Sequence, residues 1–302
     1  MAYHYSKATQ MNVYADHNFL INCAEKPTWR QAVVEAHQSG RITIVLSAWH
    51  FYEYGNASGH PETEDLIQFA EELQPQWILE RGDLQHQEFI AFWNCIWGSA
   101  PLVFNPVCTL AQAGATLNRV SVERMARYSV REYIQSFSAP GALDEIRAEL
   151  KNQTSVAKYN LDKYVNDKRF NAVLPLTELM YVAVQMARLR EIERDKVYAL
   201  ANLMLREQPL STQIQCFVYW KCTEYLKAYK TEVAFTLELY ATGATLDANR
   251  QIDRQHANAA LPYCDLFITD DGDLIKRIAR VKRELRFETA SVLRGQAFID
   301  TL

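Results

Sequence analysis

Acidic residues stand at the ends of strand-like segments in two distant parts of the chain. Asp16 ends the first predicted strand, and Asp271 follows a predicted strand near the other end of the sequence. Glu53 lies in a helical stretch after the second predicted strand, and Asp253 lies near the start of the helix that precedes the strand before Asp271. Because ligands bind beyond the carboxyl ends of parallel strands, we expect these carboxylates to converge at one edge of a sheet.

Carboxylates gathered in this way would repel one another strongly unless cations lay between them. Mg²⁺ and Mn²⁺ are hard ions that prefer oxygen ligands, and an ion held by carboxylates activates water and stabilises a phosphoryl transition state. The pattern therefore predicts a divalent-metal site that hydrolyses phosphate esters. Thr269 and Asp270 end the predicted strand just before Asp271, and Asn18 follows Asp16 by two residues.

Several of these residues also have a purely structural interpretation. Asp16 can cap a helix, and Asp270 and Asp271 compete to cap the helix expected from residue 272, so we expect one of the two to cap and the other to bind metal. Asp253 has charged neighbours that are typical of a surface. His256 shares a helix face with Asp253, and its structural interpretation is a partly buried histidine.

The elements that must position these residues alternate between strand and helix at both ends of the chain. Ser47 is expected to cap the helix after the second strand. Asp265 starts a strand, far from its carboxyl end, and is interpreted as structural. Alternating strands and helices indicate a parallel sheet with right-handed crossovers. Strands are expected over residues 11–16, 42–46, 266–269 and 285–290.

The middle of the chain has long helical patterns and little strand signal. We therefore expect residues 1–100 and 246–302 to form one discontinuous α/β domain, and residues 101–245 to form a helical insertion. Helices are expected in this insertion over residues 120–137, 142–165, 176–207 and 211–240.

Composition excludes several classes of protein. The chain has 302 residues, of which 49% are hydrophobic, so extensive disorder is not expected. A formal charge of −4 excludes a globally basic nucleic-acid-binding coat. Residues 89–118 carry no charge, but prolines and asparagines interrupt them, which favours a buried helix and loop over a membrane span. Six scattered cysteines without a C-x-x-C pair indicate reduced thiols and a cytoplasmic protein.

Three segments resemble the PIN-domain nucleases. They are VYADHNFLI at residues 13–21, LSAWHFYEYG at 46–55 and DRQHANAALPYCDLFITDD at 253–271. The resemblance implies a Rossmann-like three-layer parallel sheet and hydrolysis of phosphodiesters, usually in single-stranded RNA. It also implies that Mg²⁺ or Mn²⁺ is held by Asp16, Glu53, Asp253 and Asp271. In the same resemblance, Asn18, Thr269 and Asp270 orient these carboxylates or a water molecule. The long central insertion is a departure from the minimal family domain.

Basic residues near the C-terminal end provide a candidate contact for nucleic acid. Lys276, Arg277 and Arg280 follow the acids directly, and His256 lies one helical turn beyond Asp253. Such a group would bind phosphates in a salt-dependent way, with RNA favoured over DNA as the partner. The helical insertion is a candidate surface for homodimerisation or for a protein partner.

Two other functions remain open at this point. A metal-dependent phosphatase could act on a small phosphorylated substrate, but the dehalogenase-like phosphatases need a D-x-D motif, and this chain has Asp16-His17-Asn18. A non-catalytic module that binds nucleic acid or protein would keep the acids only as helix caps.

Overall fold

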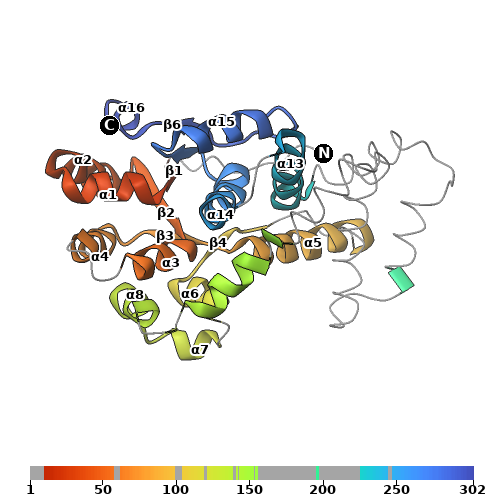
Figure 1. Cartoon of the computed structure of the whole chain (residues 1–302), viewed down its shortest axis with the longest axis horizontal. Coiled ribbons are helices and arrows are strands. Elements are labelled where there is room, and N and C mark those ends of the chain that lie inside the picture. The colour runs from red at the N-terminus through yellow and green to blue at the C-terminus, as the bar shows by residue number, and fades with distance from the viewer. Residues whose placement is uncertain are drawn as a thin grey trace.

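The computed structural model describes residues 10–57, 62–98, 104–118, 121–138, 141, 143–152, 154–155, 195–196, 225–243 and 247–302. These residues form an α/β fold around a six-stranded mixed sheet, and helices flank the sheet (Figure 1). The expectation of an α/β fold is confirmed, and the arrangement is compatible with a Rossmann-like fold. Among the helices described, none combines the length and the apolar character that crossing a lipid bilayer demands.

The sheet has the strand order β4-β3-β2-β1-β5-β6, and every neighbouring pair is parallel except β3 and β4. The central strand β1 pairs Val13 with Ile44 of β2 on one side and with Leu266 of β5 on the other. The blue C-terminal elements therefore lie beside the red N-terminal ones in Figure 1. The strands are β1 (Met11–Ala15), β2 (Ile42–Ser47), β3 (Gln76–Ile78), β4 (Val107–Cys108), β5 (Leu266–Ile268) and β6 (Ser291–Leu293).

Three of the four predicted strands are confirmed as β1, β2 and β5. The strand predicted over residues 285–290 is wrong, because the segment that pairs with β5 begins at Ser291, opposite Leu266. β3 and β4 were not predicted, and the antiparallel β4 makes the sheet mixed rather than wholly parallel.

The two faces of the sheet bury different sets of side chains, as the pleat of a strand requires. In β1, Val13 and Ala15 join one hydrophobic core, whereas Tyr14 joins the other. The first core is covered by α1 (His17–Glu25), α2 (Pro27–Gln38), α3 (Trp49–Asn56), α4 (Glu62–Leu73), α6 (Leu110–Asn118), α7 (Val122–Met125), α8 (Val130–Ser138) and α16 (Gly295–Ile299). The second core is covered by α5 (Arg81–Gly98), α13 (Lys227–Thr242), α14 (Ala248–Tyr263) and α15 (Gly272–Val281).

The described parts of residues 101–245 contact the sheet and its helices directly. β4 adds to the sheet edge beside β3, α8 packs on α3, and α13 packs on α14 and α15. The single helix predicted over residues 120–137 is wrong, since α7 and α8 occupy this stretch as two helices. The helix predicted over 176–207 falls outside the described residues except at 195–196. The division into two domains stays a prediction.

Candidate functional site

Two candidate residues meet where β1 and β5 end. Ala15 and Ile268 are register partners in the two parallel strands, so the residues that follow them leave the sheet at the same edge. Thr269 donates its hydroxyl hydrogen to Asp16 Oδ2 at 2.8 Å, and the Asp16 amide donates to the Ile268 carbonyl at 2.9 Å. The strand pairing therefore fixes the position of the Asp16 carboxylate.

Asp16 begins α1, but its side chain makes no capping hydrogen bond to that helix. The residue is only 4% exposed. Burial raises the pKa of Asp16, and the neighbouring charge of Glu53 raises it further, whereas His256 lowers it. Asp16 therefore occupies the N-cap position of α1, as a capping residue would, but without the side-chain hydrogen bond of a cap.

Asp253, on α14, is the acid most affected by its neighbours. Burial and the negative charges of Asp16 and Asp271 raise its pKa to about 7. Its carboxylate accepts no hydrogen bond from the residues that the structure describes, and its nearest cation is Arg277, whose Nη1 lies 3.7 Å from Oδ2. Asp16 and Asp271 therefore lie close enough to Asp253 for their negative charges to disfavour its ionisation.

Of the two aspartates after β5, Asp271 caps α15. Its Oδ1 accepts the amide hydrogens of Asp273 and Leu274, and its own amide donates to the Thr269 hydroxyl at 3.1 Å. Thr269 therefore contacts both Asp16 and Asp271.

Asp270 is engaged by other elements. It accepts hydrogen bonds from the Gly295 amide at 3.0 Å and the Asn22 side chain at 3.1 Å, so its carboxylate is held by α1 and the start of α16. Asn18 is exposed on α1, and its carbonyl accepts a hydrogen bond from Asn22.

Glu53 lies in a hydrogen-bonded chain that crosses from α3 to α14. Its Oε2 is 3.0 Å from His256 Nε2, and His256 Nδ1 is 2.6 Å from the Tyr14 hydroxyl. That hydroxyl lies 2.7 Å from Ser47 Oγ. The prediction that Ser47 caps the following helix is wrong, because Ala48 occupies the N-cap and the Ser47 hydroxyl is directed to Tyr14.

Glu53 and His256 keep each other charged against the effect of burial. Burial alone would raise the pKa of Glu53, but His256 and His17 hold the pKa at about 2. Burial likewise disfavours the charged form of His256, yet the charge and hydrogen bond of Glu53 raise its pKa above the ordinary value. The two residues form a buried imidazolium–carboxylate ion pair.

His50 lies beside this pair but differs from it chemically. His50, Glu53 and His256 have potential ligand atoms within 4.8 Å of one another, a spacing that could hold a metal ion. However, His50 Nε2 donates to the Ala15 carbonyl at 2.8 Å and its Nδ1 accepts from the Ser47 amide at 3.1 Å. Burial lowers the pKa of His50 to about 3, so the ring is neutral and both nitrogens are occupied. A metal at this cluster would therefore have to displace the hydrogen bonds of His50. Asp16, Asp253 and Asp271 are not among the groups of described residues whose ligand atoms all lie within 4.8 Å of one another.

The predicted nucleic-acid contacts lie in two different environments. His256 is fully buried, and Arg277 is 4% exposed between Asp253 and Glu238. Arg280 is partly exposed and pairs with Glu238 at 2.6 Å, while Lys276 is exposed on α15. Lys276 and Arg280 are therefore the members of the group that solvent reaches.

Sequence reasoning did not select Tyr14, His17 or Glu238. His17 Nδ1 lies 3.8 Å from Glu53 Oε2, and its place directly after Asp16 was the available signal. Tyr14 lies in a strand interior and reads as an ordinary core residue. Asp265 accepts a hydrogen bond from the Asn12 amide at 2.7 Å, at the start of β1, which agrees with its structural interpretation.

Comparison of the chain with protein-family models, with curated proteins and with solved structures finds no match. The geometry of the site is therefore what bears on function.

Proposed function

We propose that this chain is a divalent-metal-dependent nuclease of PIN-like type that hydrolyses phosphodiester bonds in single-stranded RNA. The observation that supports the proposal is that Thr269 joins Asp16 to Asp271 where β1 and β5 end, and that burial together with the negative charges of these two acids raises the pKa of Asp253. Carboxylates placed in this way become compatible when a divalent cation lies between them. The resemblance of residues 13–21, 46–55 and 253–271 to PIN-domain nucleases supports the same assignment.

The residues of the chain have distinct tasks in this proposal. Asp16, Asp253 and Asp271 hold Mg²⁺ or Mn²⁺. Asp271 both caps α15 and binds the ion, because the cap occupies only its Oδ1. Glu53 adds a carboxylate that is ionised at neutral pH. When bound, the cation supplies an activated water and neutralises charge that develops on the phosphodiester. Thr269 orients Asp16 through its hydroxyl and holds the Asp271 backbone through the same oxygen.

The partner and the compartment belong to the same proposal. The substrate is RNA rather than DNA, the exposed Lys276 and Arg280 contact its phosphates, and the protein acts in the cytoplasm. The described helices of residues 101–245 supply a surface for homodimerisation or for a protein partner.

The proposal is tested by cleavage of end-labelled single-stranded RNA in Mn²⁺, in Mg²⁺ and in EDTA. Wild type is compared with Asp16→Asn, Asp253→Asn and Asp271→Asn, which keep the side-chain shape, and Asn still caps α15 at position 271. Glu284→Gln removes one exposed carboxylate outside the candidate site and is the matched control. We expect metal-dependent cutting that falls at least ~100-fold in the three site variants and not in the control.

Three other outcomes contradict parts of this assignment. Cutting that survives all three site variants shows that the chemistry lies elsewhere. Hydrolysis of p-nitrophenyl phosphate without cutting of RNA favours a phosphatase. Stable binding of RNA with no hydrolysis of either substrate favours a non-catalytic module.

A further inference from the structure

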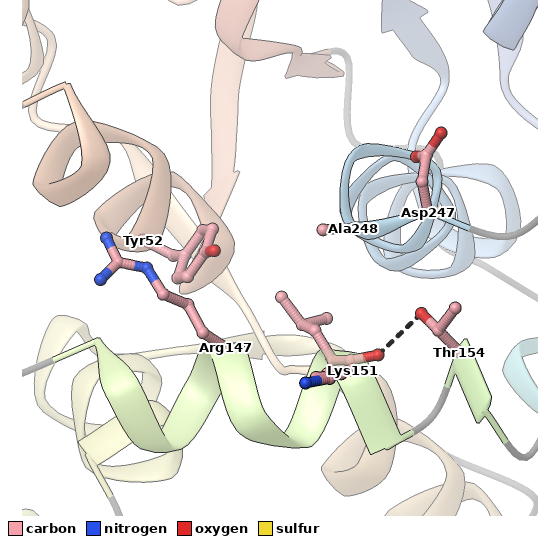
Figure 2. A pocket seen from close by; sticks show the side chains of 7 residues that line it. Tyr52, Arg147, Lys151, Thr154, Asp247 and Ala248 are labelled. Atoms are coloured by element: carbon pink, nitrogen blue, oxygen red, sulfur yellow. Dashed lines mark hydrogen bonds between the residues drawn. The ribbon is translucent and has the colours of Figure 1, made fainter.

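A cavity of about 250 Å³ opens between α3, the helical segment 143–152 and the start of α14. Figure 2 shows side chains from all three elements around it. Its lining residues are Tyr52, Arg147, Leu150, Lys151, Thr154, Asp247 and Ala248. The cavity belongs to the same helices as the candidate site, because Tyr52 directly precedes Glu53, and Ala248 lies about 8 Å before Asp253 along the α14 axis.

The walls of the cavity are apolar and its cations lie at one side. The Tyr52 ring, Leu150 and Ala248 contribute carbon surface. Arg147 and Lys151 lie one helical turn apart on the opposing segment. Arg147 is held by Asn56 at 2.8 Å and Asp144 at 3.3 Å, whereas Lys151 has no ion-pair partner in the described part of the chain.

Asp247 and Thr154 at the cavity have hydrogen-bond partners, whereas the Tyr52 hydroxyl has none among the described residues. Asp247 uses its carboxylate to accept the Arg250 amide hydrogen at 2.9 Å, and Thr154 donates to the Leu150 carbonyl at 2.9 Å. Tyr52 is only 4% exposed, yet its hydroxyl has no hydrogen-bond partner among the residues that the structure describes. In Figure 2 this hydroxyl is directed into the space between α14 and segment 143–152.

We propose that this cavity binds one nucleobase of a single-stranded nucleic acid, with an adjoining phosphate on Lys151 and Arg147. The inference rests on the proposed function and names a recognition site for its substrate. A nucleobase is flat and largely apolar, so it fits between carbon walls. The edge of the base carries hydrogen-bonding groups, and one of them would be the partner that the Tyr52 hydroxyl lacks among the described residues. The phosphate that accompanies every base complements two cations beside the cavity.

The test is a binding measurement that needs neither metal nor cleavage. Fluorescence anisotropy in EDTA follows a short fluorescein-labelled single-stranded RNA, and a second strand of the same length carries abasic sugars in place of its central nucleotides. The variants are Lys151→Gln and Tyr52→Phe, which changes only the hydroxyl. Lys26→Gln, at an exposed lysine that directly follows α1, is the control for loss of one positive charge.

The two variants are expected to differ in which strand they bind more weakly. Lys151→Gln weakens binding of both strands by ~3–10-fold at low salt and reduces the slope of log affinity against log salt by about one. Tyr52→Phe weakens binding of the intact strand by ~3–10-fold and leaves binding of the abasic strand unchanged. Lys26→Gln leaves both affinities within about twofold of wild type.

Equal affinity of wild type, Lys151→Gln and Tyr52→Phe overturns the inference, as does equal affinity of wild type for intact and abasic strands, or an absence of RNA binding. Binding that responds to both variants in a protein that cuts no RNA supports the cavity and contradicts the proposed nuclease. Metal-dependent cutting with unresponsive binding supports the nuclease and contradicts the cavity.

Discussion

His256 and Glu53 are 203 residues apart in the sequence, and His256 Nε2 lies 3.0 Å from Glu53 Oε2 in the fold. The side chain of His256 is 1% exposed and that of Glu53 is 18% exposed. The ion pair therefore links α3 to α14 in the interior of the protein, close enough to Asp16 to influence its pKa.

Removing the imidazolium should destabilise the protein. His256→Gln leaves the Glu53 carboxylate without its cation, and we expect a loss of roughly 3 kcal/mol in the free energy of unfolding, since breaking a buried ion pair strands one charge. Urea unfolding of wild type, His256→Gln, Glu53→Gln and the double variant measures the coupling. Additive losses would show that the two residues do not stabilise one another.

The same pair predicts a pH window. The pKa of Glu53 is about 2 in the fold against 4.5 ordinarily, so its stabilisation is present above pH 4.5 and is lost as pH falls toward 2. The pKa of His256 is raised above 6.5, so its stabilisation is complete below pH 6.5 and is lost as pH rises through the folded-state value. The difference in stability between wild type and His256→Gln should be largest between pH 4.5 and 6.5. A difference that is flat across acid, neutral and alkaline pH would contradict the ion pair.

Thr269 should matter through its hydroxyl alone. That group donates to Asp16 and accepts from the Asp271 amide, so Thr269→Val leaves both without their partner. We expect a loss of ~1–3 kcal/mol in stability and Mn²⁺ binding weaker by ~10–100-fold. Thr269→Ser keeps the hydroxyl and should retain most of the metal affinity. If calorimetric titration finds Thr269→Val and Thr269→Ser equally impaired, the methyl group rather than the hydroxyl is responsible.

Metal binding should displace a proton from Asp253. Its pKa of about 7 means that the carboxyl is largely protonated below neutrality, and a cation binds the ionised form. Titration calorimetry with Mn²⁺ in buffers of different ionisation enthalpy should find close to one proton released well below pH 7 and almost none well above it. Asp253→Asn should abolish this release, and Glu284→Gln should not. A proton count that is independent of pH would place the metal away from Asp253.

Glu88 supplies a pH effect that is separate from the site. It is 3% exposed, and its carboxylate accepts the Ala228 amide hydrogen at 3.0 Å and the Tyr263 hydroxyl hydrogen. Burial raises its pKa to about 8, so between pH 4.5 and 8 the folded protein holds a proton that the unfolded chain releases. This group should lower stability by up to ~1.4 kcal/mol per pH unit across that window.

Glu88→Gln mimics the protonated side chain and tests this prediction. The stability of Glu88→Gln should exceed that of wild type most at the alkaline end of the window. There the folded wild type must either bury an ionised Glu88 or keep a proton that the unfolded chain has released, and both lower its free energy of unfolding. Thermal or urea unfolding at several pH values measures the two slopes. An unchanged slope in Glu88→Gln would show that another group binds the proton.

The sequence predicts those elements whose side chains are buried on both faces. Residues 42–46 form a continuous apolar and β-branched run, and this run is β2. β3 begins with the exposed Gln76 and β4 has only two residues, so neither forms an apolar run that stands out in the sequence as residues 266–268 do. The alternating segment 285–290 is not a strand, because the register with β5 selects Ser291–Leu293 instead.

The acids of the candidate site were predictable because each stands at a strand end or on an adjoining helix. Their partners were not. Tyr14 and His256 read separately as core residues, and only the approach of β1 to α14 brings the Tyr14 hydroxyl within 2.6 Å of the imidazole. The choice of Asp271 over Asp270 as the helix cap also depends on where Gly295 and Asn22 lie, which local sequence does not specify.

The pairing of β1 with β5 has a consequence for synthesis of the protein. Asp16 and its hydrogen-bond partner Thr269 are separated by 253 residues, so during translation β1 has only β2 beside it until β5 emerges. A strand with one open side is prone to pair with other chains, and contacts between distant residues form late. The carboxylates therefore come together only after residues 253–271 have been made, and a chain released before then carries Asp16 and Glu53 without Asp253 and Asp271.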